Sequence, residues 1–376
     1  MQATNQFMQR HNALQVPNLP FYPCLEVQPC SGQSFIGELL SATSTQLLDM
    51  ALEPQSSTHI QSFMRSPSNS EYAKIIVSRL LPFLLTLCRD PVGNYVSQLI
   101  LEISEDPIFK VASDSVLQHL QELSTDAHGT RVVQRLIIVA TLRNVSSAVI
   151  KALELPAKQL AVDPHGCYVI LKAIEELPCI WLYKTLLDDS KVACSRWGVV
   201  VIKRMIEKAP NVDCMDAVLQ MTTSHFSHML TDPFGNYAIQ YILQKPDICK
   251  SGIGCIALTR MVELVASDFA RYANNKYSCN TVELIAKISG SMLVDKLCLV
   301  RRPIATVISD RYGYFVLKTL ISVSNPLQRR HLFDLFLDDL GVSICESHKL
   351  DPSRQRLIRK LKQLIPDWNH SSGITN

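Results

Sequence analysis

The chain has 376 residues, of which 47% are hydrophobic and 19% charged, and its formal net charge is only +3. This balance gives no overall basic signature for nucleic acid, so any binding to phosphates must depend on locally placed charge. No apolar stretch approaches the roughly 20 residues that span a bilayer, and the N-terminus lacks the basic and apolar regions of a signal peptide. We therefore expect no membrane partner.

Cysteine and histidine usage bounds the chemistry further. The 12 cysteines are scattered without a C-x-x-C pair, which predicts free thiols in an intracellular protein. His225 and His228 form an isolated H-x-x-H, whereas a usual metal site needs four ligands. The sequence shows no phosphate-binding glycine loop and no nucleophile elbow. We therefore expect neither a metal nor a cofactor, and not an enzyme.

The chain divides into three regions by its sequence pattern. Residues 1–40 form a flank whose start is aperiodic and rich in Gln, Asn and Pro, and we predict that it is flexible or caps the adjoining helices. A repeat array is predicted over residues 41–345, and a C-terminal cap and tail over residues 346–376. The cap has an apolar helical stripe and a basic face between Lys349 and Lys362. That face is either a solvated surface, a contact with RNA phosphates or a nuclear signal.

A repeated loop organises the array. Six of the 13 glycines share one context, in which the Gly stands three residues after an Asp or a Ser and directly before a pentad and an apolar helical run. The six segments are Asp90-Pro-Val-Gly93, Asp126-Ala-His-Gly129, Asp163-Pro-His-Gly166, Ser195-Arg-Trp-Gly198, Asp232-Pro-Phe-Gly235 and Asp310-Arg-Tyr-Gly313. We expect the Asp or Ser to cap a helix and the Gly to permit the turn that leads into it.

A pentad with a shared pattern comes after each glycine, and two weaker copies without the glycine fit the same frame. The pentads begin at residues 57, 94, 130, 167, 199, 236, 279 and 314, with separations of 32 to 43 residues. Apolar residues at helical spacing fill the intervals. We therefore predict that each of the eight repeats consists of two or three short helices, which bury their apolar faces by stacking on the neighbouring repeats.

Positions one, two and five of each pentad are predicted to share the face away from the core, because three, four and the residues after five are mostly apolar. Position one carries Asn, Thr, Cys or Ser, position two Tyr or Arg, and position five Gln or Glu. Aromatic rings at position two could stack on bases, and amides or carboxylates beside them could pair with base edges. The alternative is that the tyrosines pack and the amides join neighbouring helices. The candidate RNA-binding residues are Ser57, Thr58, Gln61, Asn94, Tyr95, Gln98, Thr130, Arg131, Gln134, Cys167, Tyr168, Lys203, Asn236, Tyr237, Gln240, Cys279, Asn280, Glu283, Tyr314, Phe315 and Lys318.

These pentads resemble the recognition helices of the Pumilio (PUF) family. The resemblance rests on Gly-Asn-Tyr-Val-Ser-Gln, Gly-Thr-Arg-Val-Val-Gln, Gly-Asn-Tyr-Ala-Ile-Gln and Cys-Asn-Thr-Val-Glu, in the family's order, and covers roughly residues 41–345. It implies an all-α fold, a right-handed α-solenoid of about eight Pumilio-type repeats forming a crescent with a C-terminal helical cap. It also implies a concave face that reads one base of single-stranded RNA per repeat.

In the family, the residues at positions one and five of a pentad form a pair that reads one base. Carried over residue by residue, these pairs imply an RNA site near 5′-NGUNNAUA-3′, bound antiparallel to the chain. Cys279 with Glu283 implies G. The pairs that imply U are Asn236 with Gln240 and Asn94 with Gln98. The pairs that imply A are Thr130 with Gln134 and Ser57 with Gln61.

Repeats four, five and eight depart from the pattern, so the bases that they face are unassigned. Repeat four has Leu171 at position five, which cannot hydrogen-bond a base edge. Repeats five and eight have Lys203 and Lys318 there, and a lysine would more naturally meet phosphates.

The resemblance implies a monomeric cytoplasmic regulator of mRNA that acts through 3′ untranslated regions and binds protein corepressors on its convex face. One alternative is a nucleolar Pumilio-like factor in ribosomal RNA processing. Another is a helical-repeat scaffold of the armadillo or HEAT kind, which would bind peptides and have no affinity for RNA.

Overall fold

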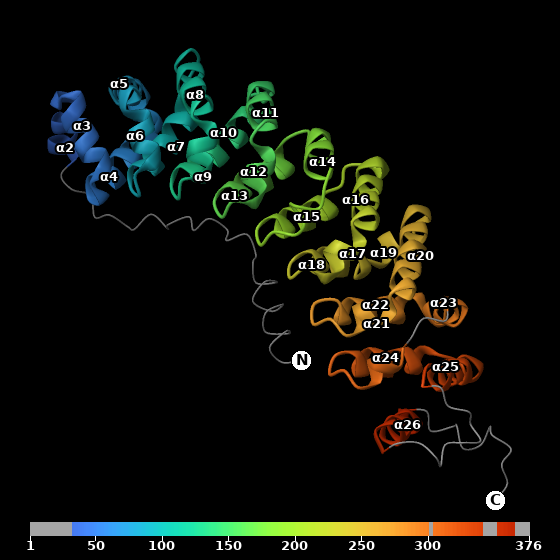
Figure 1. The fold of residues 1–376 in the computed structure, drawn as a ribbon. Coiled ribbons are helices and arrows are strands. Elements are labelled where there is room, and N and C mark those ends of the chain that lie inside the picture. Colours follow the sequence, from blue (N-terminus) through green and yellow to red (C-terminus); the bar gives the residue numbers. More distant parts are fainter. Residues whose placement is uncertain (1–31, 301–303, 341–351, 365–376) are drawn as a thin grey trace, which may run out of the picture. The chain divides into compact units, whose positions relative to one another are not determined.

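The computed structural model describes residues 32–300, 304–340 and 352–364. All regular elements of this part of the chain are helices (Figure 1), so the prediction of an all-α repeat solenoid is confirmed. The chain divides into two compact units, Met1–Phe83 and Leu84–Asn376. The first unit holds the pentad of repeat one, and the second holds those of repeats two to eight.

The first unit consists of short helices around a small core. Its elements are α2 (Gly32–Ser41), α3 (Ser44–Leu52), α4 (Pro54–Arg65), η1 (Pro67–Asn69), α5 (Ser70–Leu80) and η2 (Leu81–Phe83). Helices α3, α4 and α5 pack against one another and bury Leu47, Ile60 and Leu80 completely. The guanidinium of Arg79 donates to two backbone carbonyls at the end of α2, which fixes that helix against α5.

The second unit repeats a pattern of three elements. A short lead-in helix comes first in every repeat but the fifth, a pentad helix carries the candidate residues, and a return helix comes last. The lead-in helices are α6 (Leu84–Arg89), α9 (Leu120–Thr125), α12 (Ala157–Val162), α17 (Phe226–Thr231), α21 (Phe269–Ala273) and the 3-10 helix η3 (Ala305–Ile308). The pentad helices are α7 (Gly93–Ile103), α10 (Gly129–Leu142), α13 (Gly166–Glu176), α15 (Gly198–Glu207), α18 (Gly235–Leu243), α22 (Cys279–Ser289) and α24 (Gly313–Val323). The return helices are α8 (Ile108–Gln118), α11 (Ser147–Glu154), α14 (Ile180–Leu186), α16 (Val212–Ser224), α19 (Pro246–Cys249) with α20 (Gly252–Ser267), α23 (Met292–Val300) and α25 (Pro326–Asp339).

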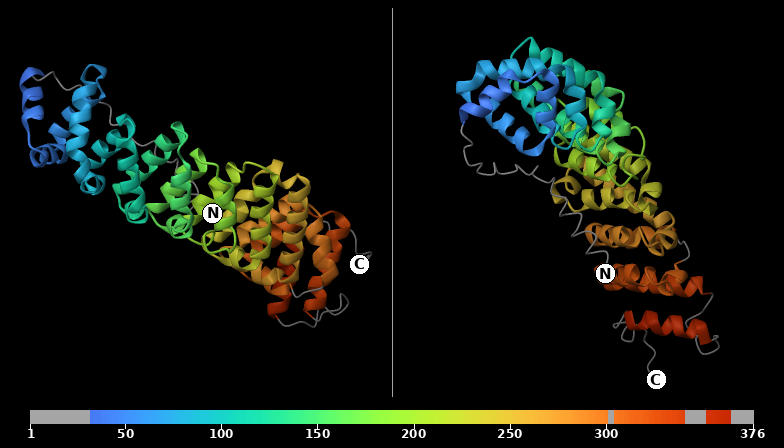
Figure 2. Two further views of the ribbon diagram at one scale, coloured as in Figure 1. Left: turned by 90° about the horizontal axis from the view of Figure 1, so that it is seen from above. Right: turned by 90° about the vertical axis from the view of Figure 1, so that its left-hand side faces the viewer.

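Each pentad helix of this unit contacts the next one along the chain, from α7 to α24. The return helices from α11 to α25 also contact one another in chain order, and the layers keep this order in Figures 1 and 2. Fully buried side chains such as Val96, Ile137 and Ile202 fill the space between the layers. The core therefore extends along the array, as expected for repeats that cannot bury their apolar faces alone.

The loop glycines serve close packing rather than an unusual backbone. Among the described residues, positive φ angles occur only at Asn144 and Gly290, so the loop glycines do not adopt a left-handed backbone conformation. Instead, a Cβ added to Gly129 would lie 2.8 Å from the carbonyl oxygen of Leu123 in the lead-in helix, and a Cβ on Gly166 would clash in the same way. The space between the two helices excludes any side chain there.

Both ends of the chain are described only in part. Helix α2 lies partly in the expected N-terminal flank, and its Leu39 is completely buried, whereas residues 1–31 lie outside the described part. Helix α26 (Pro352–Leu364) contacts η3 and buries Ile358 and Leu361, which suits the predicted apolar stripe. Among the described helices, none combines the length and apolarity that a bilayer span requires.

Candidate nucleic-acid interface

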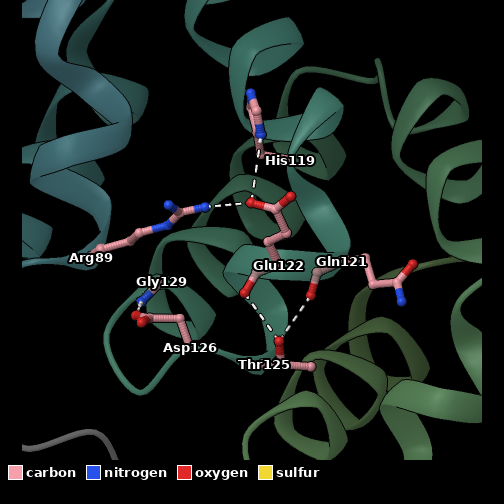
Figure 3. A network of polar contacts seen from close by, with 7 residues as sticks. All are labelled: Arg89, His119, Gln121, Glu122, Thr125, Asp126 and Gly129. Atoms are coloured by element: carbon pink, nitrogen blue, oxygen red, sulfur yellow. Dashed lines mark hydrogen bonds and ion pairs between the residues drawn. The ribbon is translucent and has the colours of Figure 1, made fainter.

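A capping residue stands four positions before each pentad and fixes the loop. In five repeats an Asp Oδ1 accepts hydrogen bonds from the glycine N–H and from the N–H before it, at 2.7–2.9 Å. Figure 3 shows the bond from Gly129 to Asp126. Ser195 accepts from Gly198 at 2.9 Å, so the predicted capping role is confirmed.

The glycine pattern misses two capping residues. Asn275 accepts from the N–H groups of Tyr277 and Ser278 in repeat seven. Glu53 accepts from Ser56 N–H at 2.6 Å in repeat one, and this backbone hydrogen bond lowers the pKa of Glu53. The signal that could have found both is the fixed distance of four residues to the pentad.

Repeat seven shows how a larger residue replaces the loop glycine. Ser278 occupies the glycine position and is completely buried. Its hydroxyl donates to the carbonyl oxygen of Tyr272 at 2.6 Å. That carbonyl is the counterpart of the one that a Cβ would clash with at the loop glycines. A hydrogen bond therefore takes the place of the close backbone contact.

Position one is buried, which corrects the prediction that it lies on an exposed face. Its residue is at most 6% exposed in repeats one to seven. In repeats two to six the pentad helix starts at the glycine position, so position one lies in its first turn, next to the carbonyls of the loop before it. Asn94 Nδ2 donates to the carbonyls of Asp90 and Pro91, both at 2.9 Å. Thr130 Oγ1 donates to the carbonyl of His165, in the loop of the next repeat, at 3.0 Å.

Position five is hydrogen-bonded to position one in the four repeats that have Gln there. The Gln Nε2 donates to the side-chain oxygen one turn earlier at 2.8–3.2 Å. The four pairs are Gln61 with Ser57, Gln98 with Asn94, Gln134 with Thr130 and Gln240 with Asn236. Each amide is thereby oriented and keeps one N–H and its carbonyl oxygen for an outside partner, a set that matches a base edge.

Repeat seven has a carboxylate where these repeats have an amide. The side chain of Glu283 is 15% exposed, and its Oε2 lies 3.9 Å from Lys287 Nζ. Thr319, in the pentad helix of repeat eight, donates to the same oxygen at 3.2 Å. An ionised carboxylate only accepts hydrogen bonds, so this position favours a partner with two donors.

Position two places rings and a guanidinium beside these pairs. Tyr95, Tyr168 and Tyr237 are half-buried, and burial raises the pKa of Tyr168 and of Tyr237. Arg131 Nη1 donates to the Tyr95 hydroxyl at 3.1 Å, which joins repeats two and three. Phe315 is 48% exposed. In repeats one and seven, the small polar residues Thr58 and Asn280 stand at this position.

The three departing repeats differ from one another. Leu171 is buried and offers no hydrogen bond. Lys203 Nζ lies 5.9 Å from the ring centroid of Tyr237 and 5.6 Å from that of Tyr241, and burial lowers the pKa of this lysine. Lys318 is exposed. Of the two lysines that were expected to meet phosphates, only Lys318 is therefore openly presented to solvent.

Polar contacts between repeats hold this arrangement in register. Arg89 of α6 pairs with Glu122 of α9, which also lies near His119 (Figure 3). Gln121 Nε2 then donates to Gln159 Oε1 of α12 at 2.9 Å. Exposed ion pairs stabilise a fold only slightly, so their contribution here is mainly to alignment.

No group of His, Cys, Asp or Glu among the described residues is arranged to hold a metal ion. His228 Nδ1 instead lies 3.1 Å from Ser190 Oγ, which joins two repeats. Every described cysteine is a free thiol.

Comparisons with known proteins agree with this architecture. A profile described as "Pumilio-family RNA binding repeat" matches residues 84–110, 119–146, 158–179, 225–247 and 304–335, which contain five of the pentads. A Pumilio domain-containing protein of Schizosaccharomyces pombe is 21% identical over 87% of this chain and 47% of its own length. Pumilio homolog 11 of Arabidopsis thaliana is 24% identical over 76% of this chain and 50% of its own length. The chain thus spans about half the length of the curated relatives that it matches.

Solved structures show the same fold. A Puf4 RNA binding domain bound to an RNA 3′ UTR recognition sequence has a TM-score of 0.65 and 23% identity, over 83% of this chain and 97% of that one. The RNA-binding domain of yeast Puf5p bound to AAT2 RNA also has a TM-score of 0.65, with 16% identity over 85% and 96% of the two chains. The stacked helical repeats and their recurring polar pentads place the chain in the class of helical-repeat proteins. Five segments of the chain match the Pumilio-family repeat, and the chain is similar to Pumilio proteins over most of its length.

Proposed function

We propose that the chain binds single-stranded RNA in a sequence-specific manner, with one base facing each reading repeat. The observation that carries this proposal is the oriented amide at position five of repeats one, two, three and six. A residue that only packed between helices would have no need of a donor and an acceptor fixed at the same place in each repeat. The Puf4 and Puf5p domains of the same fold are bound to RNA in their structures.

The proposed recognition site lies near 5′-NGUNNAUA-3′. The acceptor-only Glu283 suits guanine, whose edge offers two donors, and the amides suit bases that offer one donor and one acceptor. Repeats four and five, with Leu171 and Lys203, provide no such pair, so two unread positions separate GU from AUA. Repeat eight leaves the first position unread.

The cellular role that we propose is regulation of mRNA through 3′ untranslated regions. Its support is that the Puf4 and Puf3 domains are bound to 3′ UTR recognition sequences in their structures. A cytoplasmic location, a monomeric state and corepressors bound outside the reading helices belong to this proposal. The unread positions of repeats four, five and eight keep ribosomal RNA as a second target class.

Selection from a random RNA library with the purified chain tests the site. We expect enrichment of GU and AUA separated by two positions without preference. Enrichment without GU before AU, or no enrichment at all, would refute sequence reading, and the latter would favour a protein scaffold. Crosslinking in cells and sequencing of the bound RNA then separate mRNA from ribosomal RNA.

A further inference from the structure

The loops before the pentad helices change charge along the second unit. Each loop has four residues, from the capping residue to the glycine position. The loops at residues 90–93, 126–129, 163–166 and 232–235 contain one Asp and no Lys or Arg. Those at residues 195–198 and 275–278 contain one cation and no acid, and the loop at residues 310–313 contains one of each. We call these last three, in repeats five, seven and eight, the cationic loops.

The cation of each cationic loop lies over the ring of the next residue in the chain. Arg196 Cζ is 5.1 Å from the ring centroid of Trp197. Lys276 Nζ is 4.5 Å from the centroid of Tyr277, and Arg311 Cζ is 4.6 Å from that of Tyr312. All three cations are exposed. The cation–π contacts limit the freedom of the long side chains while leaving their charge in solvent.

The acidic groups near these cations are few or already engaged. Ser195 and Asn275 are neutral capping residues, and the Asp310 carboxylate accepts from the backbone N–H groups of Tyr312 and Gly313. The hydrogen bond with Tyr277 raises the pKa of Lys276, and the nearby charge of Arg311 opposes this rise. Within the described part of the chain, no ion pair involves any of the three loop cations. None of the three is therefore held by an acidic side chain, and each is available to an outside anion.

The cationic loops also lie close to the reading residues. Position one comes directly after each loop, and the loops stand at the same end of α15, α22 and α24 in Figure 1. Two of the three loops belong to repeats five and eight, which lack a base-reading pair. A strand held there needs contacts that do not depend on the base.

We propose that the cationic loops bind the phosphates of the RNA strand on the side of repeats five to eight. This inference rests on the proposed RNA binding and adds a second, sequence-independent contact to it. Phosphate contacts fix the register of a strand without reading its sequence, so they offset the missing pairs of repeats five and eight. The exposed Lys318 adds a further cation on the pentad helix of repeat eight.

The test is the salt dependence of RNA affinity in the triple variant R196A/K276A/R311A. The matched control removes three exposed lysines elsewhere, K151A/K184A/K250A. Two RNAs of equal length are used, one carrying GU and AUA at the predicted spacing and one with the same bases scrambled. Each single-strand phosphate contact contributes about 0.7 to the slope of log K against log salt, so the triple variant should reduce the slope by roughly 2 on both RNAs. The charge-preserving variant R196K/R311K should keep the slope of the unchanged protein.

The outcomes separate this proposal from the proposed function. A slope equal to that of the control variant overturns phosphate binding, as does a loss of affinity that affects the matched RNA alone. Equal affinity of the unchanged protein for both RNAs refutes sequence reading but leaves the slope comparison intact. Displacement of RNA by polyglutamate from the unchanged protein, but not from the triple variant, would assign the loops to acidic peptides and overturn the RNA contact.

Discussion

Glu283→Gln is expected to change the base preferred by repeat seven from G towards A. The carboxylate at this position accepts one hydrogen bond from Thr319 and has Lys287 at 3.9 Å. It retains lone pairs for the two donors of a guanine edge, whereas a glutamine would present an N–H to one of them. Losing one good base-edge pair changes discrimination by ~1–3 kcal/mol, which is roughly 5- to 150-fold in the ratio of affinities.

Fluorescence anisotropy with two RNAs that differ only by G or A at the second position of the site measures this ratio directly. The control is Glu154→Gln, which makes the same chemical change on the exposed surface of α11. The control should leave both affinities unchanged. A Glu283→Gln protein that still prefers G by the original ratio would show that this repeat does not read a base, and the inference from the oriented pairs would fail with it.

Other predictions concern the scaffold. Gly129→Ala should lower the melting temperature, because the added Cβ would lie 2.8 Å from a backbone oxygen and overpacking costs typically 1–3 kcal/mol. The control is Gly252→Ala, which should not lower it, because a Cβ added to Gly252 would meet no atom within 4 Å. Ser278→Gly should destabilise repeat seven by about 1 kcal/mol, because the hydrogen bond of the serine hydroxyl is lost. Unfolding in urea measures this change. Unchanged stability would contradict the inference that this hydrogen bond replaces the close backbone contact of the loop glycines. Burial raises the pKa of Cys167 to about 12, so this thiol should stay protonated at pH 8 and react with iodoacetamide far more slowly than the exposed Cys255; peptide mapping checks the order, and equal rates would contradict it.

The repeat organisation could be predicted because its signals are local. The capping residues, the loop glycines and the apolar helical spacing all act within one repeat, and each recurs at nearly constant distance. The position of the Lys203 side chain could not be predicted in the same way, because its amine lies near two aromatic rings of the following repeat.

The role of the glycines and the burial of position one share that limit. Both depend on how closely a pentad helix approaches the lead-in helix and the neighbouring pentad helices. Sequence spacing identifies which residues lie on one helix face, but it does not give the distance to the surface opposite. The glycine pattern misses Asn275 for a different reason, since repeat seven keeps the cap and lacks the glycine.

The hydrogen bonds from Thr130 to the loop of repeat four and from Thr319 to Glu283 cross repeat boundaries. The base-reading residues of these two repeats are thus each hydrogen-bonded to the repeat that comes after them. Exchanging whole repeats to change the RNA target would therefore transfer the base-reading residues without these hydrogen bonds. Segments cut within the return helices, carrying a pentad together with the next loop and pentad helix, are the units to exchange.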